Sequence, residues 1–134
     1  MIFLPGTNAF SRYFRGDDTP LRDCFLAEWV NGRLSAVVLG ELEFGAAKSG
    51  VARFRIRLTQ LLTTVSGVEP WTADDAAAYG RVRADLERRG VLIGAHDMQI
   101  AAQALRLGAV CVTHNQRHLG LVPGLKLQDW QALP

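Results

Sequence analysis

The sequence predicts an α/β fold in which helices flank a central parallel sheet on both faces. Short apolar runs recur along the chain, and amphipathic segments with helical spacing separate them. Strands that alternate with helices pair in parallel, because each connecting helix packs across a face of the sheet. The length of 134 residues and the hydrophobic content of 49% are typical of one globular domain, which we predict to span residues 1–134.

The first quarter of the chain contains one predicted strand and two predicted helices. Residues 2–4 form an apolar run that a Pro-Gly pair ends. Thr7-Asn8 offers N-cap chemistry to a helix that closes at Gly16-Asp17-Asp18. A second helix begins at Thr19-Pro20, where proline occupies the first helical position, which tolerates it. Asn31-Gly32 then breaks the chain.

The second predicted strand covers residues 34–38, and a helix that begins at Gly40 follows it. This boundary puts Glu41 just beyond a strand end, in the first turn of a helix. In parallel sheets covered by helices, ligands bind beyond the carboxyl ends of the strands. Glu41 therefore stands at an edge of the sheet where a functional site is expected.

Three further helices and three further strands are predicted downstream. A helix with apolar residues between 54 and 62 precedes a candidate strand at residues 65–68, and a strongly periodic helix over residues 74–89 ends at Gly90. The last segments are a helix opened by Asp97, a strand at residues 109–112, a polar turn at residues 114–118 and a strand-like piece at residues 125–127. Strands thus alternate with helices over most of the chain, as the predicted fold class requires.

Asp97 is the acid around which the candidate site is built. It opens an apolar helix that runs through Ile100 and Leu105, so it is held at the edge of the core and points outward. One interpretation is that Asp97 only caps this helix. The other is that it forms a site with Glu41, the second carboxylate at the mouth of the sheet. Since the Asp97 helix directly precedes a strand, we expect a loop to carry Asp97 to the edge that holds Glu41.

Two carboxylates at one edge of a sheet suggest a shared hard cation. Mg²⁺ and Mn²⁺ prefer oxygen ligands, and Mg²⁺ usually takes one or two protein carboxylates together with waters and substrate phosphates. Such a centre suits phosphodiester hydrolysis, which needs an activated water and neutralisation of the developing charge. The sequence therefore favours a nuclease with Mg²⁺ or Mn²⁺ as its cofactor.

Other functional classes find less support in the sequence. The formal net charge of +2 is weak evidence about partners, and the arginine clusters suit solvated helix faces or an RNA-contacting rim. No apolar run approaches membrane-spanning length and no signal-like leader is evident, so we expect a cytoplasmic protein with no membrane partner. Cys24 and Cys111 lie far apart and do not suggest zinc; Cys111 is predicted to be a reduced, buried thiol. We find neither a Walker-type phosphate loop nor a convincing Ser-His-Asp arrangement.

Several conspicuous side chains are predicted to have structural or solvent-facing roles. His96 and His114 are interpreted as surface histidines, although either could contact RNA. Glu43, two residues beyond Glu41, points elsewhere on a helix and is interpreted as a solvated charge. Trp71 and Trp130 could stack on bases, but aromatic residues at such positions more often close a core.

Five stretches carry a resemblance to a known family, and they occur in the order and spacing of that family. They are Leu4-Pro5-Gly6-Thr7-Asn8, residues 35–45, residues 90–97 with Ile100-Ala101-Ala102, Val112-Thr113-His114-Asn115, and Val122-Pro123-Gly124-Leu125 with Asp129-Trp130. Over nearly its whole length the chain resembles the PIN-domain ribonucleases, and within them the VapC toxins of bacterial type II toxin–antitoxin pairs. The resemblance implies a PIN-like three-layer fold with the parallel sheet between layers of helices.

The resemblance also implies roles for individual residues. Glu41 looks like the second acid of the family and Asp97 like the third, and both belong to its metal site. Gly6 occupies the place of the first aspartate, which is usually the central metal ligand. Asn115 takes the place of a further acid and is predicted to be catalytic. The residues implied to position the substrate are Thr7, Asn8, Thr113 and His118, of which His118, when protonated, is a phosphate partner.

Gly6 is the largest departure from the family pattern, because glycine has no side chain to offer a metal. Losing one carboxylate lowers the negative charge of the site and weakens its affinity for divalent cations. Three explanations remain open: a substitution that disarms a toxic enzyme, a naturally degenerate member, and a member in which another oxygen compensates. The retained acids and Thr7-Asn8 favour the disarmed toxin.

The resemblance implies a metal-dependent endoribonuclease whose substrate is often a transfer RNA. It further implies a homodimer and a cognate VapB-type antitoxin that wraps the toxin and blocks the acidic pocket. The alternative is a PIN-like protein that no longer cleaves and serves as an RNA-binding or antitoxin-binding decoy, which Gly6 supports. A receiver-like signalling domain is a weaker third hypothesis, because the sequence lacks the acidic pair and the lysine that such domains place at fixed positions.

Overall fold

A parallel β-sheet forms the centre of the protein, whose structure is a computed structural model that describes residues 1–131. Strand β4 (Val110–Val112) lies between β1 (Phe3–Pro5) and β5 (Lys126–Gln128) and pairs with both in parallel. Strands β2 (Leu34–Ser35) and β3 (Val68–Glu69) form a second parallel pair. A parallel bridge between Phe3 and Gly32 connects this pair to β1. The predicted parallel sheet is therefore confirmed.

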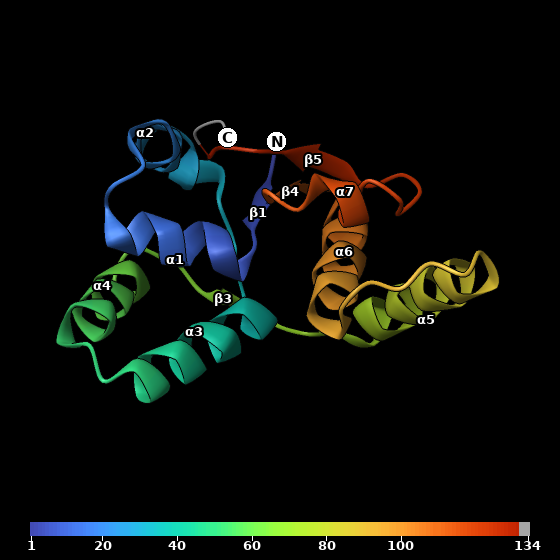
Figure 1. Ribbon diagram of the computed structural model, residues 1–134, viewed down its shortest axis with the longest axis horizontal. Coiled ribbons are helices and arrows are strands. Elements are labelled where there is room, and N and C mark those ends of the chain that lie inside the picture. Colours follow the sequence, from blue (N-terminus) through green and yellow to red (C-terminus); the bar gives the residue numbers. More distant parts are fainter. Residues whose placement is uncertain (132–134) are drawn as a thin grey trace.

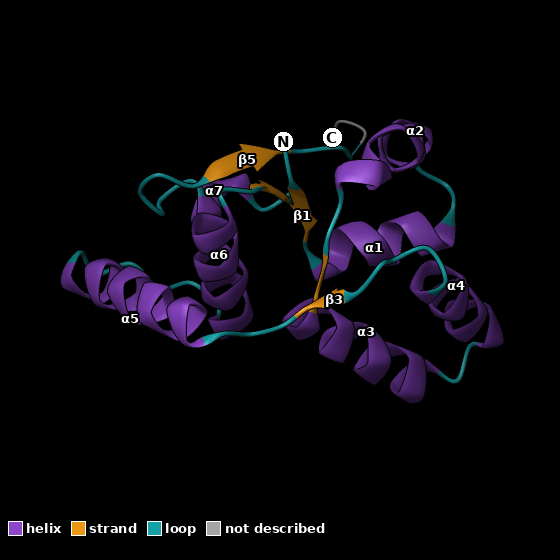
Figure 2. Cartoon of the chain, turned by 180° about the vertical axis from the view of Figure 1, so that it is seen from behind, coloured by secondary structure: helices purple, strands orange, loops and turns teal. Residues whose placement is uncertain are grey.

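Helices cover both sides of the strands, as Figures 1 and 2 show from opposite directions. Helices α1 to α4 lie on one side, and α5 and α6 lie on the other. The predicted three-layer α/β arrangement is thus confirmed. The helices are α1 (Thr7–Arg15), α2 (Thr19–Glu28), the 3₁₀ turn η1 (Trp29–Asn31), α3 (Ala36–Ser49), α4 (Ala52–Leu62), α5 (Ala73–Arg88), α6 (Ala95–Leu107) and α7 (Gln116–Leu119).

The core lies between the sheet and the helices and is rich in aromatic residues. Leu4 on β1 and Cys111 on β4 are fully buried. Trp130, which follows β5, is 6% exposed and contacts the rings of Phe3 and Phe25 at centroid distances of 5.3 and 5.1 Å. The predictions that Cys111 is a buried free thiol and that Trp130 closes the core are confirmed.

The second strand is shorter than predicted. It ends at Ser35, whose hydroxyl accepts a hydrogen bond from the Val37 backbone N–H at 3.1 Å and thereby caps α3. Helix α3 begins at Ala36, so Glu41 lies in its second turn and not in its first. The apolar run over residues 36–39 suits a buried strand and a buried helix equally well, and the N-cap decides between them.

An ion pair between α5 and α6 holds α6 in place. Arg106 of α6 donates to both carboxylate oxygens of Asp75, at 2.6 and 2.9 Å, and Asp75 is fully buried. Burial raises the pKa of Asp75, but the hydrogen bonds from Arg106 and Thr72 outweigh it and hold the pKa below its ordinary value. The same pair raises the pKa of Arg106. Since Asp97 lies in the first turn of α6, this contact helps to position the candidate site.

Candidate active site

The turn from β1 into α1 brings Gly6 to the carboxyl edge of the sheet. Its backbone N–H donates to the carbonyl oxygen of Val112 at 3.0 Å, which extends the β1–β4 pairing by one residue. Gly6 is the N-cap of α1 and has φ −78° and ψ 173°, an extended conformation open to any residue. A Cβ atom built there would meet only the Val112 oxygen, at 3.7 Å. The backbone therefore leaves room for a side chain at this position.

Asp97 reaches this same edge without a connecting loop. Helix α6 turns back tightly into β4 at Gly108, so the first turn of α6 lies near the end of β4. The amide nitrogen Nδ2 of Asn115 donates to Oδ2 of Asp97 at 3.0 Å. The expected loop is therefore a wrong prediction, because a helix that runs antiparallel to its following strand already places its N-terminus there. The N-cap interpretation is also wrong: Gly94 is the N-cap of α6, and no side chain caps it.

Glu41 faces the site from α3. Its carboxylate oxygen Oε1 lies 2.9 Å from Nε2 of His96, which connects α3 to α6. The His96 side chain is 62% exposed and that of Glu41 is 33% exposed. His96 is therefore a surface histidine as predicted, but one that engages a candidate ligand. Glu43 points away from Glu41 and forms an ion pair with Arg55 at 2.9 Å.

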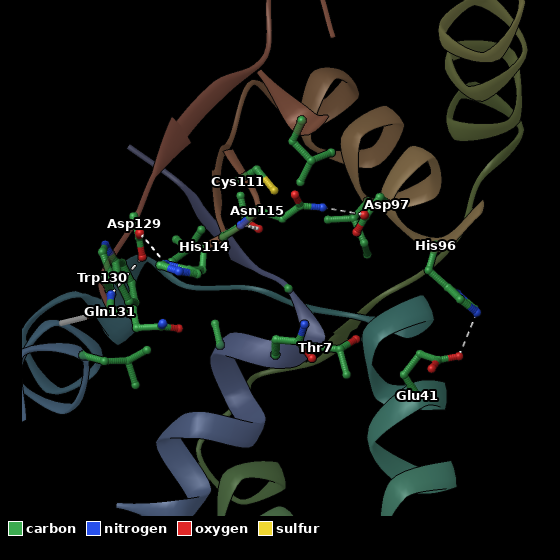
Figure 3. A pocket seen from close by; sticks show the side chains of 18 residues that line it. Thr7, Glu41, His96, Asp97, Cys111, His114, Asn115, Asp129, Trp130 and Gln131 are labelled. Atoms are coloured by element: carbon green, nitrogen blue, oxygen red, sulfur yellow. Dashed lines mark hydrogen bonds and ion pairs between the residues drawn. The ribbon is translucent and has the colours of Figure 1, made fainter. Parts of the chain in front are cut away.

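A second pair of histidine and carboxylate lies across the site. Nδ1 of His114, which follows β4, lies 2.8 Å from Oδ2 of Asp129, which follows β5. Figure 3 shows this pair on the other side of the pocket from Glu41 and His96. Sequence reasoning treated His114 as a surface histidine and gave Asp129 no role. The sequence feature that could have indicated a role for both residues is that each stands just beyond a predicted strand.

These side chains line one cavity of about 260 Å³. Most of the predicted site residues meet there, although they come from separate segments of the chain. His118 does not: it lies on α7, exposed and outside the cavity. The predicted site residues that line the cavity are Gly6, Thr7, Asn8, Glu41, Asp97, Thr113 and Asn115.

Cys111 also lines the cavity but is unsuited to nucleophilic chemistry. Burial raises the pKa of its thiol to about 12, and the negative charge of Asp97 adds to the effect. A thiol with so high a pKa stays protonated at neutral pH, whereas the thiolate is the reactive form. The chemistry of the cavity therefore falls to its carboxylates, histidines and amides.

The donor set suits a hard divalent cation but is sparse. Among residues 1–131, no three His, Cys, Asp or Glu side chains cluster closely enough to hold a metal ion. Glu41 and Asp97 still present carboxylate oxygens to the same cavity. Mg²⁺ takes only one or two protein carboxylates in many sites, so these residues fit such an ion. Gly6 lines the same cavity and contributes no side chain to this donor set.

The sequence pattern of the PIN domain matches residues 4–122 of the chain. The chain belongs to the PIN-domain family. Relatives of this PIN domain include a Shigella flexneri protein named "tRNA(fMet)-specific endonuclease VapC", which is 34% identical over 96% of the chain and 97% of its own length. The Haemophilus influenzae protein "Ribonuclease VapC1" is also 34% identical, over 97% of the chain and 98% of its own length. The resemblance to VapC toxins is thereby confirmed.

Solved structures support the same assignment. The PIN domain is similar to a chain in the crystal structure of VapBC2 from Rickettsia felis bound to a promoter DNA fragment. The two chains superpose with a TM-score of 0.87 at 27% identity, and the match covers 98% of this chain and all of the other. Within residues 1–131, no helix of this PIN domain is long and apolar enough to cross a membrane.

Proposed function

We propose that this PIN domain is the toxin of a type II toxin–antitoxin pair and that its cavity hydrolyses RNA phosphodiester bonds with the help of Mg²⁺ or Mn²⁺. The observation that carries the proposal is the meeting of Glu41 and Asp97 in one cavity at the carboxyl edge of the sheet. They come from different helices, and such convergence is characteristic of ligand sites in parallel sheets. RNA supplies the phosphodiester that this chemistry requires, and the cytoplasm is where we expect the protein to meet it.

Each residue of the cavity has a distinct task in this proposal. Glu41 and Asp97 would hold the metal ion, which, when bound, supplies a Lewis acid and lowers the pKa of a water. Asn115 holds the Asp97 carboxylate through its amide N–H and so limits the rotation of that ligand. The hydroxyl of Thr113 accepts a hydrogen bond from the Asn115 backbone N–H at 2.9 Å and so steadies the loop that carries Asn115.

The start of α1 would bind the RNA phosphate. The first N–H groups of a helix have no intrahelical partner, and they favour negative charge. Thr7 and Asn8 belong to this first turn, and both line the cavity. We therefore assign them to substrate positioning. We leave His118 out of the proposed site because it lies outside the cavity.

Gly6 sets the expected level of activity. With only two carboxylates the cavity carries less negative charge than a complete site would, so we expect weak metal binding and slow cleavage. Its ordinary backbone angles and the open space around its Cβ position mean that an aspartate can be restored without strain. This combination supports the interpretation of a disarmed toxin.

We also propose a transfer RNA substrate, a VapB-type antitoxin and a homodimer. The Shigella flexneri relative is named for its action on tRNA(fMet), and the Rickettsia felis structure contains a VapBC complex. The carboxylates of the cavity would attract a basic side chain of an antitoxin as they attract a metal ion. Such a contact would block the cavity by simple charge complementarity.

The test compares the chain with its Gly6→Asp variant by isothermal titration with Mg²⁺ and Mn²⁺ and by cleavage of a transfer RNA mixture. We expect tight binding and cleavage in Gly6→Asp and the loss of both when Asp97→Asn is added. Glu43→Gln in the same background is the matched control, because Glu43 lies two residues from Glu41 but binds Arg55 outside the cavity. A folded Gly6→Asp variant that binds neither cation nor cuts RNA would refute the proposal.

A binding protein without activity is the second candidate, and Gly6 is the observation that favours it. Such a protein would bind RNA or an antitoxin through the same cavity but would not cut. In this case Gly6→Asp would leave RNA uncut, while RNA binding, measured by fluorescence anisotropy, would persist in both forms. The same pair of proteins therefore separates the two candidates.

A further inference from the structure

The pair of His114 and Asp129 is a polar feature of the cavity that the proposed function does not use. Both carboxylate oxygens of Asp129 are engaged: Oδ2 pairs with Nδ1 of His114 at 2.8 Å, and Oδ1 accepts from the backbone N–H of Gln131 at 3.0 Å. The Asp129 side chain is only 19% exposed. An aspartate held at both oxygens fixes the ring that it contacts.

Neighbouring contacts make the pair rigid. The backbone N–H of Thr113 donates to the carbonyl oxygen of Gln128 at 2.9 Å, so the β4–β5 pairing continues up to the residues beside His114 and Asp129. Trp130, directly after Asp129, is buried against Phe3 and Phe25. The sheet and the core therefore hold the pair at a fixed place on the cavity wall.

The orientation of the His114 ring leaves its nitrogen Nε2 available to contact a substrate. Because Asp129 occupies Nδ1, the second nitrogen, Nε2, is the one left to contact a substrate. No partner for Nε2 occurs among the residues that the structure describes. The His114 side chain is half exposed and lines the cavity. A histidine oriented by a carboxylate is a common arrangement for proton transfer.

The position of the pair indicates which proton it would move. Asp97 and Glu41 lie on the other side of the cavity in Figure 3. In a displacement at phosphorus, the attacking and departing oxygens lie roughly in line on opposite sides of the phosphorus atom. If the attacking water lies beside the two acids, the departing oxygen faces His114.

We propose that His114 is a further catalytic residue that donates a proton to the departing sugar oxygen, and that Asp129 is its positioning residue. The oxygen of water forms a bond to phosphorus while the bond from phosphorus to the sugar oxygen breaks. The proton moves from Nε2 of the His114 imidazolium to that sugar oxygen. The proton that the water loses goes to solvent, from which His114 is protonated again. This step rests on the proposed ribonuclease function.

The test uses two substrates that differ in their need for a proton. RNA releases a sugar alkoxide, which needs protonation, whereas bis(4-nitrophenyl) phosphate releases 4-nitrophenolate, which leaves without it. In the Gly6→Asp background we expect His114→Gln to cut RNA about 100-fold more slowly, as general acids typically contribute that much or more. Hydrolysis of the nitrophenyl ester should change by less than about threefold, by the same reasoning.

Further variants separate catalysis from structure. Asp129→Asn should slow RNA cleavage but spare the ester, and it tests the pair independently if His114→Gln fails to fold. Asp23→Asn is the matched control, because Asp23 is an exposed surface aspartate paired with Arg22. Asp97→Asn should slow both substrates, since it acts on the attacking side. Thermal melts of each variant show whether folding has changed.

The outcomes distinguish this proposal from the function on which it rests. RNA cleavage that falls while ester hydrolysis persists supports proton donation by His114. Equal loss on both substrates, or no loss on either, overturns it while cleavage by the Gly6→Asp variant still supports the ribonuclease. Absence of cleavage of either substrate by folded Gly6→Asp overturns both proposals.

Discussion

Replacing Arg106 with methionine removes the guanidinium that neutralises the buried Asp75 carboxylate at close range. Asp75 is fully buried, and Arg106 donates to both of its oxygens, while Glu69 lies 3.3 Å from the same guanidinium. Removing one partner of a buried ion pair leaves an uncompensated charge and costs about 3–5 kcal/mol. Natural domains have a free energy of unfolding of about 5–15 kcal/mol, so Arg106→Met should remove a large part of it.

Urea unfolding followed by circular dichroism at neutral pH measures this loss. The double variant Arg106→Met with Asp75→Asn should recover much of it, because an amide costs less to bury than a carboxylate. Asp85→Asn, which removes an exposed i,i+4 pair with Arg89, is the control and should cost less than about 1 kcal/mol. An Arg106→Met variant that loses less than about 1 kcal/mol would refute the view that this pair holds α6 on α5, because that loss is typical of a surface pair.

The same pair predicts the direction of the pH dependence. The pKa of Asp75 is lowered in the folded protein, so its charge contributes stability at pH values above its unfolded pKa. That contribution is lost as the pH falls through the folded pKa, in the acid range below about pH 4. Asp75→Asn should flatten the fall in the free energy of unfolding in this range. If the free energy of unfolding of Asp75→Asn falls with acid pH as steeply as that of the unmodified protein, other carboxylates control the acid dependence.

Three further predictions concern single side chains. Ser35→Ala should lower the free energy of unfolding by about 1 kcal/mol through loss of the α3 N-cap, and an unchanged urea midpoint would contradict this. Trp130→Ala should cost about 3–5 kcal/mol in the same assay, because it empties a buried site against Phe3 and Phe25; a cost below about 1 kcal/mol would place its ring outside the core. Cys111 should resist iodoacetamide in the native protein at pH 8 and react after unfolding, as mass spectrometry can show, whereas rapid labelling of native protein would contradict its burial.

Local sequence signals correctly predicted the end of α1 and the beginning of α2. Gly16 ends α1 in the left-handed conformation, and Pro20 stands in the first turn of α2 with Asp18 as its N-cap. These signals are local because the caps and turns involve residues only a few positions apart. The strand predicted at residues 34–38 ends at Ser35, and this error arises because no periodic signal decides the conformation of the run. A short, mostly apolar run such as this one has no clear period, so its conformation depends on what packs around it.

In the candidate site, too, local motifs indicated individual residues, whereas the contacts between them depend on the tertiary structure. We predicted Glu41 and Asp97 as site residues from the sequence because the family motifs surround them, and we interpreted Gly6 as a departure for the same reason. The pairing of Glu41 with His96 spans 55 positions, and that of His114 with Asp129 spans 15. No local pattern encodes such contacts. The contact of His114 with Asp129 exists because β4 and β5 pair in parallel and end at the same edge, and that of Glu41 with His96 exists because α3 and the first turn of α6 meet there.

The sequence by itself determined the α/β class and the PIN family, since both depend on residue type and order along the chain. Only the tertiary structure decided that Asp97 reaches the edge without a loop, that His118 lies outside the cavity, and that His114 faces the acids across it. The physical reason is that these outcomes depend on the direction of α6 relative to β4 and on side-chain packing. Both are set by contacts between residues distant in the chain.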